Sequence, residues 1–151
     1  MANQPIFANN TPPMRCIHFG RLVSEKGADI IVDLIEQIFL HSETRIVLDI
    51  YGDGPFGAEI LRKFSNRVGF FDGTKEGSIP EIGYRVGYHG YRPKSVIQSA
   101  LEQSHYLLMP SRFLETFGLS ALESISEGVP VIAFAQGGLT QFLQSKHAVD
   151  P

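Results

Sequence analysis

Short apolar runs alternate with longer segments of helical periodicity along this chain, and this alternation constrains the fold more than any other feature. Short apolar runs predict strands at 14–19, 44–51, 84–88, 105–109 and 129–134, of which 44–51 is rich in β-branched residues. One-sided apolar stripes predict helices at 29–40 and 56–68. Pro93 in a first turn and Gly128 just past a helix end favour helices at 93–103 and 117–127, and a further helix is predicted to begin at 139. Helices that separate short strands in this way connect parallel strands. We therefore predict an α/β fold with a doubly wound, mainly parallel sheet and helices on both of its faces.

The 151 residues are enough for a single domain with a sizeable core. Residues 1–13 are polar and rich in Asn and Pro, and we predict that they form an N-terminal arm or linker before a domain over 14–151. Within that domain, residues 69–84 contain four glycines and a proline, which interrupt any periodicity. This stretch is predicted to be a loop or hairpin excursion from the sheet.

Charge and cysteine content argue against several classes of protein. The chain has 13 Lys and Arg against 16 Asp and Glu, a net charge of −3, which disfavours general binding to nucleic acid or to anionic membranes. A single cysteine, Cys16, excludes an internal disulfide, and its apolar neighbours predict a place in the core. The chain shows no signal peptide, and no run approaches the ~20 apolar residues of a transmembrane segment. We expect a cytoplasmic protein.

In folds of this kind, ligands bind beyond the carboxyl ends of the strands, so the loops that follow the strands are the places to search. The loop after the first predicted strand, residues 20–27, carries Arg21 and Lys26 between two glycines. Glycine allows a ligand to approach the backbone closely, and the start of the next helix offers free N–H groups, so this loop is suited to a diphosphate. The alternative is a solvated turn in which Lys26 pairs with Glu25 or Asp29.

Two carboxylates flank a helix start in the loop after the fourth predicted strand. Glu115 precedes the helix and Glu123 lies eight residues further on, which is about 12 Å along a helix. This separation is too long for both groups to bind one metal ion, and it exceeds the distance between the two carboxyl groups of a glycoside hydrolase. It suits the two ends of an extended ligand whose anionic middle lies against the helix N–H groups. Alternatively, both acids are ordinary charges near a helix start.

The loop after the second predicted strand, Gly52-Asp53-Gly54-Pro55-Phe56-Gly57, matches the G-x-G-x-x-G fingerprint of dinucleotide-binding proteins, with Asp72 about 20 residues further on. An NAD-dependent oxidoreductase is therefore an alternative. Against it, the fingerprint normally follows the first strand of its sheet, and Pro55 removes one of the N–H groups that would face a pyrophosphate. A tight turn that begins a helix also accounts for the glycines.

In their order along the chain, these motifs resemble the C-terminal, donor-binding half of retaining glycosyltransferases with the GT-B architecture, of the group 1 or family 4 type. The resemblance covers about residues 15–143 and rests above all on the spacing of Glu115 and Glu123 ahead of Gly128-Val129-Pro130-Val131. The other matching motifs are Gly20-Arg21-Leu22 with Lys26-Gly27, Gly52-Asp53-Gly54-Pro55, Val86 to Gly90, Pro110-Ser111 and Gly137-Gly138. The resemblance implies a Rossmann-like fold that forms one half of such an enzyme.

The resemblance also implies a role for each candidate residue. Gly20, Arg21 and Lys26 would bind the diphosphate of a nucleotide-sugar, and the two cations would stabilise the charge that develops on the leaving nucleoside diphosphate. Glu115 would contact hydroxyls of the donor sugar, and Glu123 would accept hydrogen bonds from the ribose. Arg21, Lys26 and Glu115 are thus the catalytic candidates.

Further ligand contacts are implied at two other places. The amides near Phe117, Gly118 and Leu119 would face the sugar and the phosphates, and Tyr91 would lie beside the base. Neither a metal ion nor a cofactor is implied, since the nucleotide-sugar is itself a co-substrate. Two residues depart from the family pattern: Gln141 stands where an acid is common, and Thr116 where a small residue is usual.

The expected function is that of the donor-binding half of a retaining, nucleotide-sugar-dependent glycosyltransferase, inactive without an acceptor-binding N-terminal domain that this sequence does not contain. The alternatives are a module that binds a nucleotide-sugar without catalysis and the NAD-dependent oxidoreductase. The sequence leaves open the donor base, the sugar and the acceptor.

Overall fold

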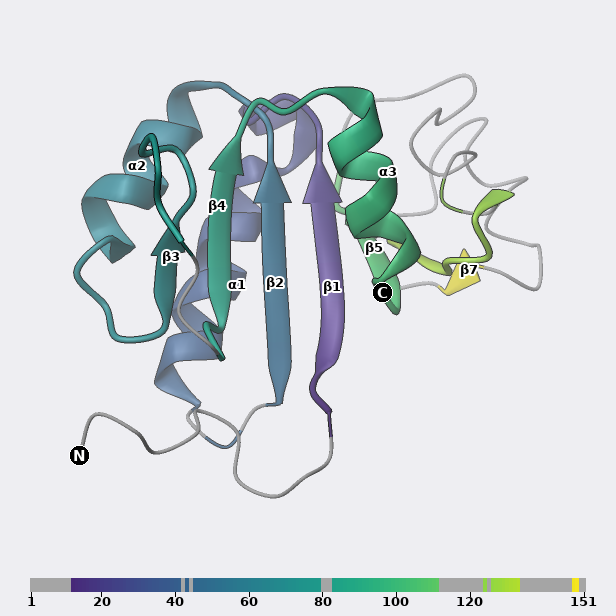
Figure 1. Cartoon of the computed structure of the whole chain (residues 1–151), viewed down its shortest axis with the longest axis horizontal. Helices are drawn as coiled ribbons and strands as arrows, with labels where there is room; N and C mark the ends of the chain where they lie inside the picture. The colour runs from purple at the N-terminus through teal and green to yellow at the C-terminus, as the bar shows by residue number, and fades with distance from the viewer. Residues whose placement is uncertain are drawn as a thin grey trace.

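A single sheet organises the part of the chain that the computed structural model describes, namely residues 12–41, 43, 45–79, 83–111, 124, 126–133 and 148–149. Seven strands form it in the order β3-β4-β2-β1-β5-β6-β7, and every neighbouring pair is parallel (Figure 1). The strands are β1 (Met14–Phe19), β2 (Ile46–Tyr51), β3 (Phe70–Asp72), β4 (Val86–Gly90), β5 (Tyr106–Met109), β6 (Val131–Ala133) and β7 (Ala148–Val149). The helices are α1 (Ala28–Leu40), α2 (Pro55–Phe64) and α3 (Lys94–Glu102), with a short 3-10 turn, η1 (Ser24–Lys26), before α1.

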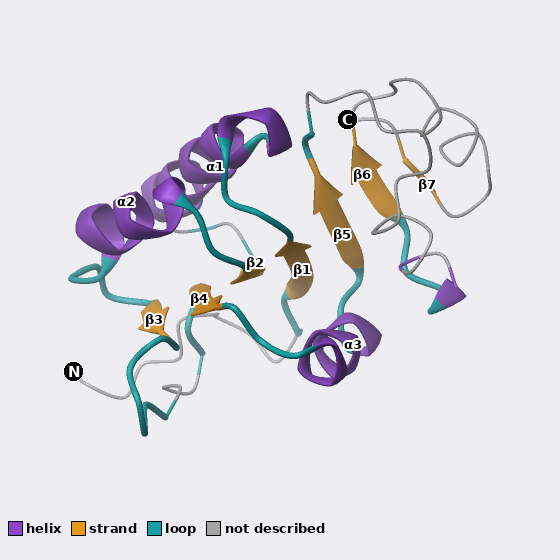
Figure 2. Cartoon of the chain, turned by 90° about the horizontal axis from the view of Figure 1, so that it is seen from above, coloured by secondary structure: helices purple, strands orange, loops and turns teal. Residues whose placement is uncertain are grey.

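The helices cover both faces of the sheet, as predicted. Figure 2 shows α1 and α2 side by side on one face and α3 on the other. Outward from the central β1, the sheet continues with β2, β4 and β3 on one side and with β5, β6 and β7 on the other. After β4, the chain crosses to the other side of β1 and continues there with β5. The order in which strands are added therefore reverses between β1 and β5, and the loops that follow these two strands flank this switch point. The predicted doubly wound α/β fold is confirmed.

Alternating side chains of the strands supply two cores. On the α1 and α2 face, Cys16 packs with residues such as Leu48 and Ile35, and on the α3 face Ile17 packs with Leu101. The Cys16 side chain is buried, and burial raises the pKa of its thiol to about 11. Because only the thiolate is nucleophilic, Cys16 is an inert core residue, as its apolar neighbours predicted.

One stretch differs from its prediction. Within the loop or hairpin predicted for 69–84, Phe70–Asp72 is a strand that pairs in parallel with β4, Phe70 lying opposite Val86. Sequence periodicity cannot reveal a three-residue strand between two glycines, and its pairing partner lies beyond the intervening turns. Two smaller differences concern α2, which ends at Phe64 rather than at 68, and α3, for which Pro93 is the N-cap.

The two helices predicted at 117–127 and from 139 onward are not tested by the structure. Almost all of the first and the whole of the second lie outside the described residues. The N-terminal arm predicted for residues 1–13 lies almost entirely outside them as well.

A buried histidine links the two central strands. His18 on β1 is 4% exposed, and its Nδ1 lies 2.9 Å from the Leu108 carbonyl oxygen on β5. Its Nε2 has no hydrogen-bond partner within the described part of the chain. Burial lowers the pKa of His18 from its ordinary value of 6.5, so the folded protein holds this ring neutral with a proton on Nδ1.

This burial makes stability dependent on pH. The unfolded chain gains a proton on His18 below about pH 6.5, and the folded chain does so only at lower pH, so acid favours unfolding. We expect the His18 contribution to cost the native protein at most about 2 kcal/mol between pH 7.5 and pH 5. Urea unfolding at both pH values should show a smaller loss of stability in His18→Phe than in the wild type. Equal losses in both proteins would contradict a neutral, buried His18.

Candidate functional site

The carboxyl ends of β1, β2, β4 and β5 meet at one edge of the sheet, and the loops that follow them form the candidate site. Residues 20–27, the β1 loop, pack against the first residues after β5. The Ser111 hydroxyl donates a hydrogen bond to the Glu25 carbonyl oxygen over 3.3 Å. A Cβ on Gly27, whose φ is +76°, would overlap the Pro110 carbonyl. The start of the loop after β5 therefore lies beside the β1 loop, as the switch point predicts.

Arg21 and Lys26 come together within the β1 loop. With Val23 and Glu25 they line a cavity of about 350 Å³, within the size range of small-molecule sites. Gly27, in a left-handed conformation, is the C-cap of η1 and the N-cap of α1, whose 13 residues direct the positive end of the helix dipole toward this loop. Two cations and a helix start around one cavity are suited to binding an anionic ligand with more than one phosphate.

The β2 turn, residues 52–57, packs against the β1 loop, and its glycines have no empty space beside them for a ligand. A Cβ on Gly52 would overlap the Gly20 carbonyl oxygen, and a Cβ on Gly54 would overlap that of Leu22. A Cβ on Gly57 would meet the Tyr88 hydroxyl. Protein atoms thus fill the spaces that a dinucleotide-binding turn leaves to a pyrophosphate. The NAD interpretation of this motif is not supported.

The β4 turn, residues 88–92, is held to its neighbours on two sides. The Gly52 N–H donates to the Gly90 carbonyl oxygen over 2.8 Å, and the Arg92 guanidinium donates to the carbonyl oxygens of Gly73 and Tyr91. The Tyr91 side chain is 71% exposed at the tip. The exposed ring on this turn is suited to stacking on a base, and the contact of Tyr91 with a base stays a prediction.

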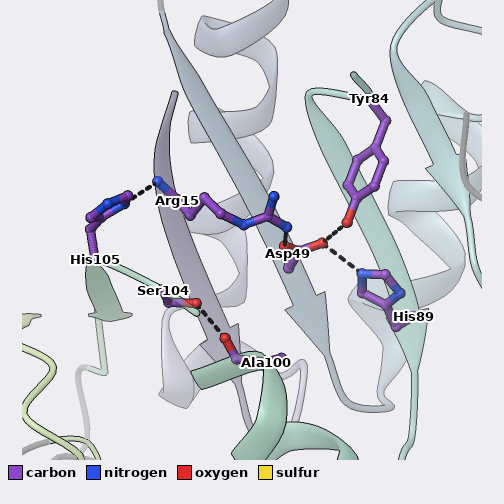
Figure 3. Close-up of polar contacts among 7 residues, drawn as sticks. All are labelled: Arg15, Asp49, Tyr84, His89, Ala100, Ser104 and His105. Carbon is purple, nitrogen blue, oxygen red and sulfur yellow. Dashed lines mark hydrogen bonds and ion pairs between the residues drawn. The ribbon is translucent and has the colours of Figure 1, made fainter. Parts of the chain in front are cut away.

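A polar network that the sequence analysis missed lies on the α3 face of the sheet (Figure 3). The Asp49 carboxylate, 7% exposed, accepts hydrogen bonds from Arg15 over 3.2 Å and from the Tyr84 hydroxyl over 2.5 Å, and its Oδ1 lies 2.7 Å from His89 Nε2. The ring of His89 stacks on that of Tyr51, with 4.5 Å between their centroids. The signal was an acidic residue inside an apolar strand, at a position whose neighbours are buried.

The polar groups of this network pair with one another. Burial and the Asp49 charge raise the pKa of Tyr84, and burial raises the pKa of Tyr51 to about 12, so both phenols stay protonated at neutral pH. The carboxylate is already engaged by three partners within the protein. The arrangement therefore anchors β2 to β4 and β1, and it offers no group poised for chemistry.

The remaining candidates lie where the structure gives no description. Glu115, Phe117, Gly118, Leu119 and Glu123 are all outside the described residues, so their predicted contacts with a ligand stay predictions. Across the residues that are described, no group of three or more His, Cys, Asp or Glu side chains is placed to hold a metal ion. None of the described helices combines the length and apolar character needed to cross a membrane.

Comparison with protein families and curated sequences gives one consistent result. A family model described as Glycosyl transferases group 1 matches residues 13–149. Sulfoquinovosyl transferase SQD2 of Arabidopsis thaliana is 28% identical over 127 residues, which are 84% of this chain and 20% of the relative. D-inositol 3-phosphate glycosyltransferase of Streptomyces coelicolor is 31% identical over 136 residues, which are 85% of this chain and 27% of the relative. The chain thus spans less than a third of the length of these relatives.

Solved structures show the same fold. Anabaena Alr3699/HepE in complex with UDP aligns with a TM-score of 0.66 at 22% identity, over 92% of this chain and 35% of that protein. TarM aligns with a TM-score of 0.66 at 20% identity, over 95% of this chain and 27% of that protein. At this level of identity the likeness establishes the architecture alone.

Proposed function

Because the chain belongs to the glycosyl transferases group 1 family, we propose that it is the donor-binding part of a retaining, nucleotide-sugar-dependent glycosyltransferase. The observation that carries this proposal is the placement of Arg21 and Lys26 around one cavity, where α1 begins beside the switch point of the sheet. Since the chain spans less than a third of its relatives, the complete reaction and its acceptor belong to the proposal as well.

In this proposal the β1 loop binds the diphosphate and assists its departure. Breaking the bond between sugar and phosphate leaves negative charge on the nucleoside diphosphate, and the two cations with the N-terminus of α1 stabilise that charge as it develops. Gly20 lets the phosphates approach the backbone. No metal ion is needed in this scheme, because Arg21 and Lys26 supply the positive charge.

The sugar, ribose and base of the donor contact residues outside the β1 loop. Glu115 contacts the sugar hydroxyls, Glu123 accepts hydrogen bonds from the ribose, and the amides near Phe117, Gly118 and Leu119 face the sugar and the phosphates. Tyr91, exposed on the β4 turn, lies beside the base. Alr3699/HepE, which shares the fold, has been solved with UDP-glucose and with UDP, and this supports a nucleotide-sugar as the ligand class.

Transfer in this architecture takes place between two domains, so we propose that an acceptor-binding domain completes the enzyme and that this chain is inactive alone. A module that binds a nucleotide-sugar without catalysis is the second candidate. The two are separated by supplying an acceptor-binding half in trans and assaying transfer of labelled sugar, which only the first candidate supports. The cytoplasmic location stays a prediction.

Calorimetric titration of the chain with UDP, GDP, ADP and NAD tests the proposal directly. We expect at least one nucleoside diphosphate to bind and NAD to bind more weakly or not at all, because the β2 turn has no space for a pyrophosphate at its glycines. Binding of NAD together with failure of all three nucleoside diphosphates would overturn the proposed function.

A further inference from the structure

The β2 turn touches both of the loops that the proposed function assigns to the donor. The side of Gly52 that lacks a Cβ faces the Gly20 carbonyl of the β1 loop. Its N–H donates to the Gly90 carbonyl oxygen of the β4 turn over 2.8 Å, and its own carbonyl oxygen accepts from the buried Tyr88 hydroxyl over 2.8 Å. One glycine thus lies between the β1 loop and the β4 turn, in contact with both.

A second set of contacts holds the β1 loop against the β2 turn. Leu22, which follows Arg21, is fully buried. Its N–H donates to the Asp53 carbonyl oxygen over 2.8 Å, and its carbonyl oxygen accepts from the Phe56 N–H over 3.2 Å. Gly54 lies against the Leu22 backbone with no room for a Cβ. The backbone next to Arg21 therefore takes its position from the β2 turn.

The spacing between the two loops matters because a nucleotide has a fixed length. A ligand that engages the β1 loop with its diphosphate and the β4 turn with its base binds well only if both sites stand at the matching distance before it arrives. The β1 loop and the β4 turn belong to strands that are not neighbours, since β2 lies between β1 and β4. Gly52, which follows β2, contacts both of them.

We propose that Gly52 is a positioning residue that sets the distance between the β1 loop and the β4 turn for a nucleoside diphosphate. This inference rests on the proposed function. It gives the glycine motif of the β2 turn a role that requires no contact with the ligand. Any side chain at residue 52 would meet backbone rather than a flexible side chain, and the φ of +135° is one that only glycine adopts without strain.

Gly52→Ala tests this role, with Gly77→Ala as the matched control. Gly77 also has a positive φ, +72°, but a Cβ there meets no atom within 4 Å, so the control replaces a positive-φ glycine without the collision. In Gly52→Ala, the β2 turn and the β1 loop must separate by about 1 Å to relieve the overlap. Affinities for UDP, GDP and ADP are measured alongside that for inorganic pyrophosphate, which engages the β1 loop alone.

We expect Gly52→Ala to lower the affinity for the nucleoside diphosphate that the wild type binds by about tenfold or more, and that for pyrophosphate by less than about threefold. Gly77→Ala should change neither. Equal losses for both ligands would mean that the β1 loop itself is damaged, and unchanged affinity would mean that the spacing is irrelevant. Either result overturns the inference.

A readout without ligand separates this inference from the proposed function. In ¹⁵N-correlated NMR spectra, Gly52→Ala should shift the amide signals of Leu22 and of Tyr91 together, because both loops contact residue 52, and Gly77→Ala should leave them in place. Movement in only one of the two loops would refute the coupling, even if the wild type bound no nucleotide. Coupled shifts in a chain that binds no nucleoside diphosphate would instead refute the proposed function.

Discussion

Replacing Arg21 and Lys26 together by alanine is expected to weaken nucleoside diphosphate binding by about 100-fold or more, and each single replacement by about tenfold. Both side chains line the same cavity at the start of α1. A hydrogen bond to a charged group contributes roughly 1.5–3 kcal/mol, and two such groups act on one diphosphate. Calorimetric titration of the wild type and the three variants measures the effect.

The control for this prediction removes the same charge elsewhere. Arg62 and Lys63 are exposed in the last turn of α2, at the end of that helix remote from the β2 turn. Alanine at both positions changes the net charge by the same two units and should leave the affinity within about twofold. Unchanged affinity in both single variants and in the Arg21 and Lys26 double variant would make the β1 loop a solvated turn, the alternative that its sequence also allowed.

Replacing Asp49 by alanine is expected to lower the free energy of unfolding by about 3 kcal/mol. The carboxylate is buried, and its removal leaves the Tyr84 hydroxyl and His89 Nε2 without the acceptor they share. Breaking a buried pair costs roughly 3–5 kcal/mol, and the lower end applies here because the Arg15 side chain is 39% exposed and can turn to water. Urea unfolding at pH 7.5 provides the measurement.

Two variants distinguish this network from a general effect of removing an acid. Asp49→Asn keeps the shape and one acceptor oxygen and should cost clearly less than Asp49→Ala. Asp33→Ala removes an exposed carboxylate from α1 and should change stability by no more than about 0.5 kcal/mol. If Asp49→Ala were as mild as Asp33→Ala, the network would have no part in holding β2 to its neighbours.

Most of the architecture could be predicted because periodicity is a local property. The alternation of buried and exposed positions along α1 and the apolar run of β2 are both visible within ten or so residues. The edge strand β3 could not be found in this way, because three residues carry no period and its partner β4 lies beyond the turns that follow. Pairing between distant segments is a property of the folded chain alone.

The polar residues of the site region likewise fall into those that could be predicted from the sequence and those that could not. Arg21 and Lys26 could be identified from two cations and two glycines within one predicted loop, and the structure brings them to one cavity. The network around Asp49 could not be found, since Arg15, Tyr84 and His89 come from separate parts of the sequence and meet only when β1, β2 and β4 align.

By itself, the sequence determined the α/β class, the order of most elements and the loop that carries the two cations, because each depends on neighbours along the chain. It could not decide what the glycines of the β2 turn are for. Spaced as Gly52, Gly54 and Gly57, they match a pyrophosphate cradle, although Pro55 and their place after the second strand favour a packed turn. Only the tertiary structure, which sets the Gly20 and Leu22 carbonyls and the Tyr88 hydroxyl against them, decided for packing. A sequence shows where a side chain is missing, and the fold determines which atoms fill the space.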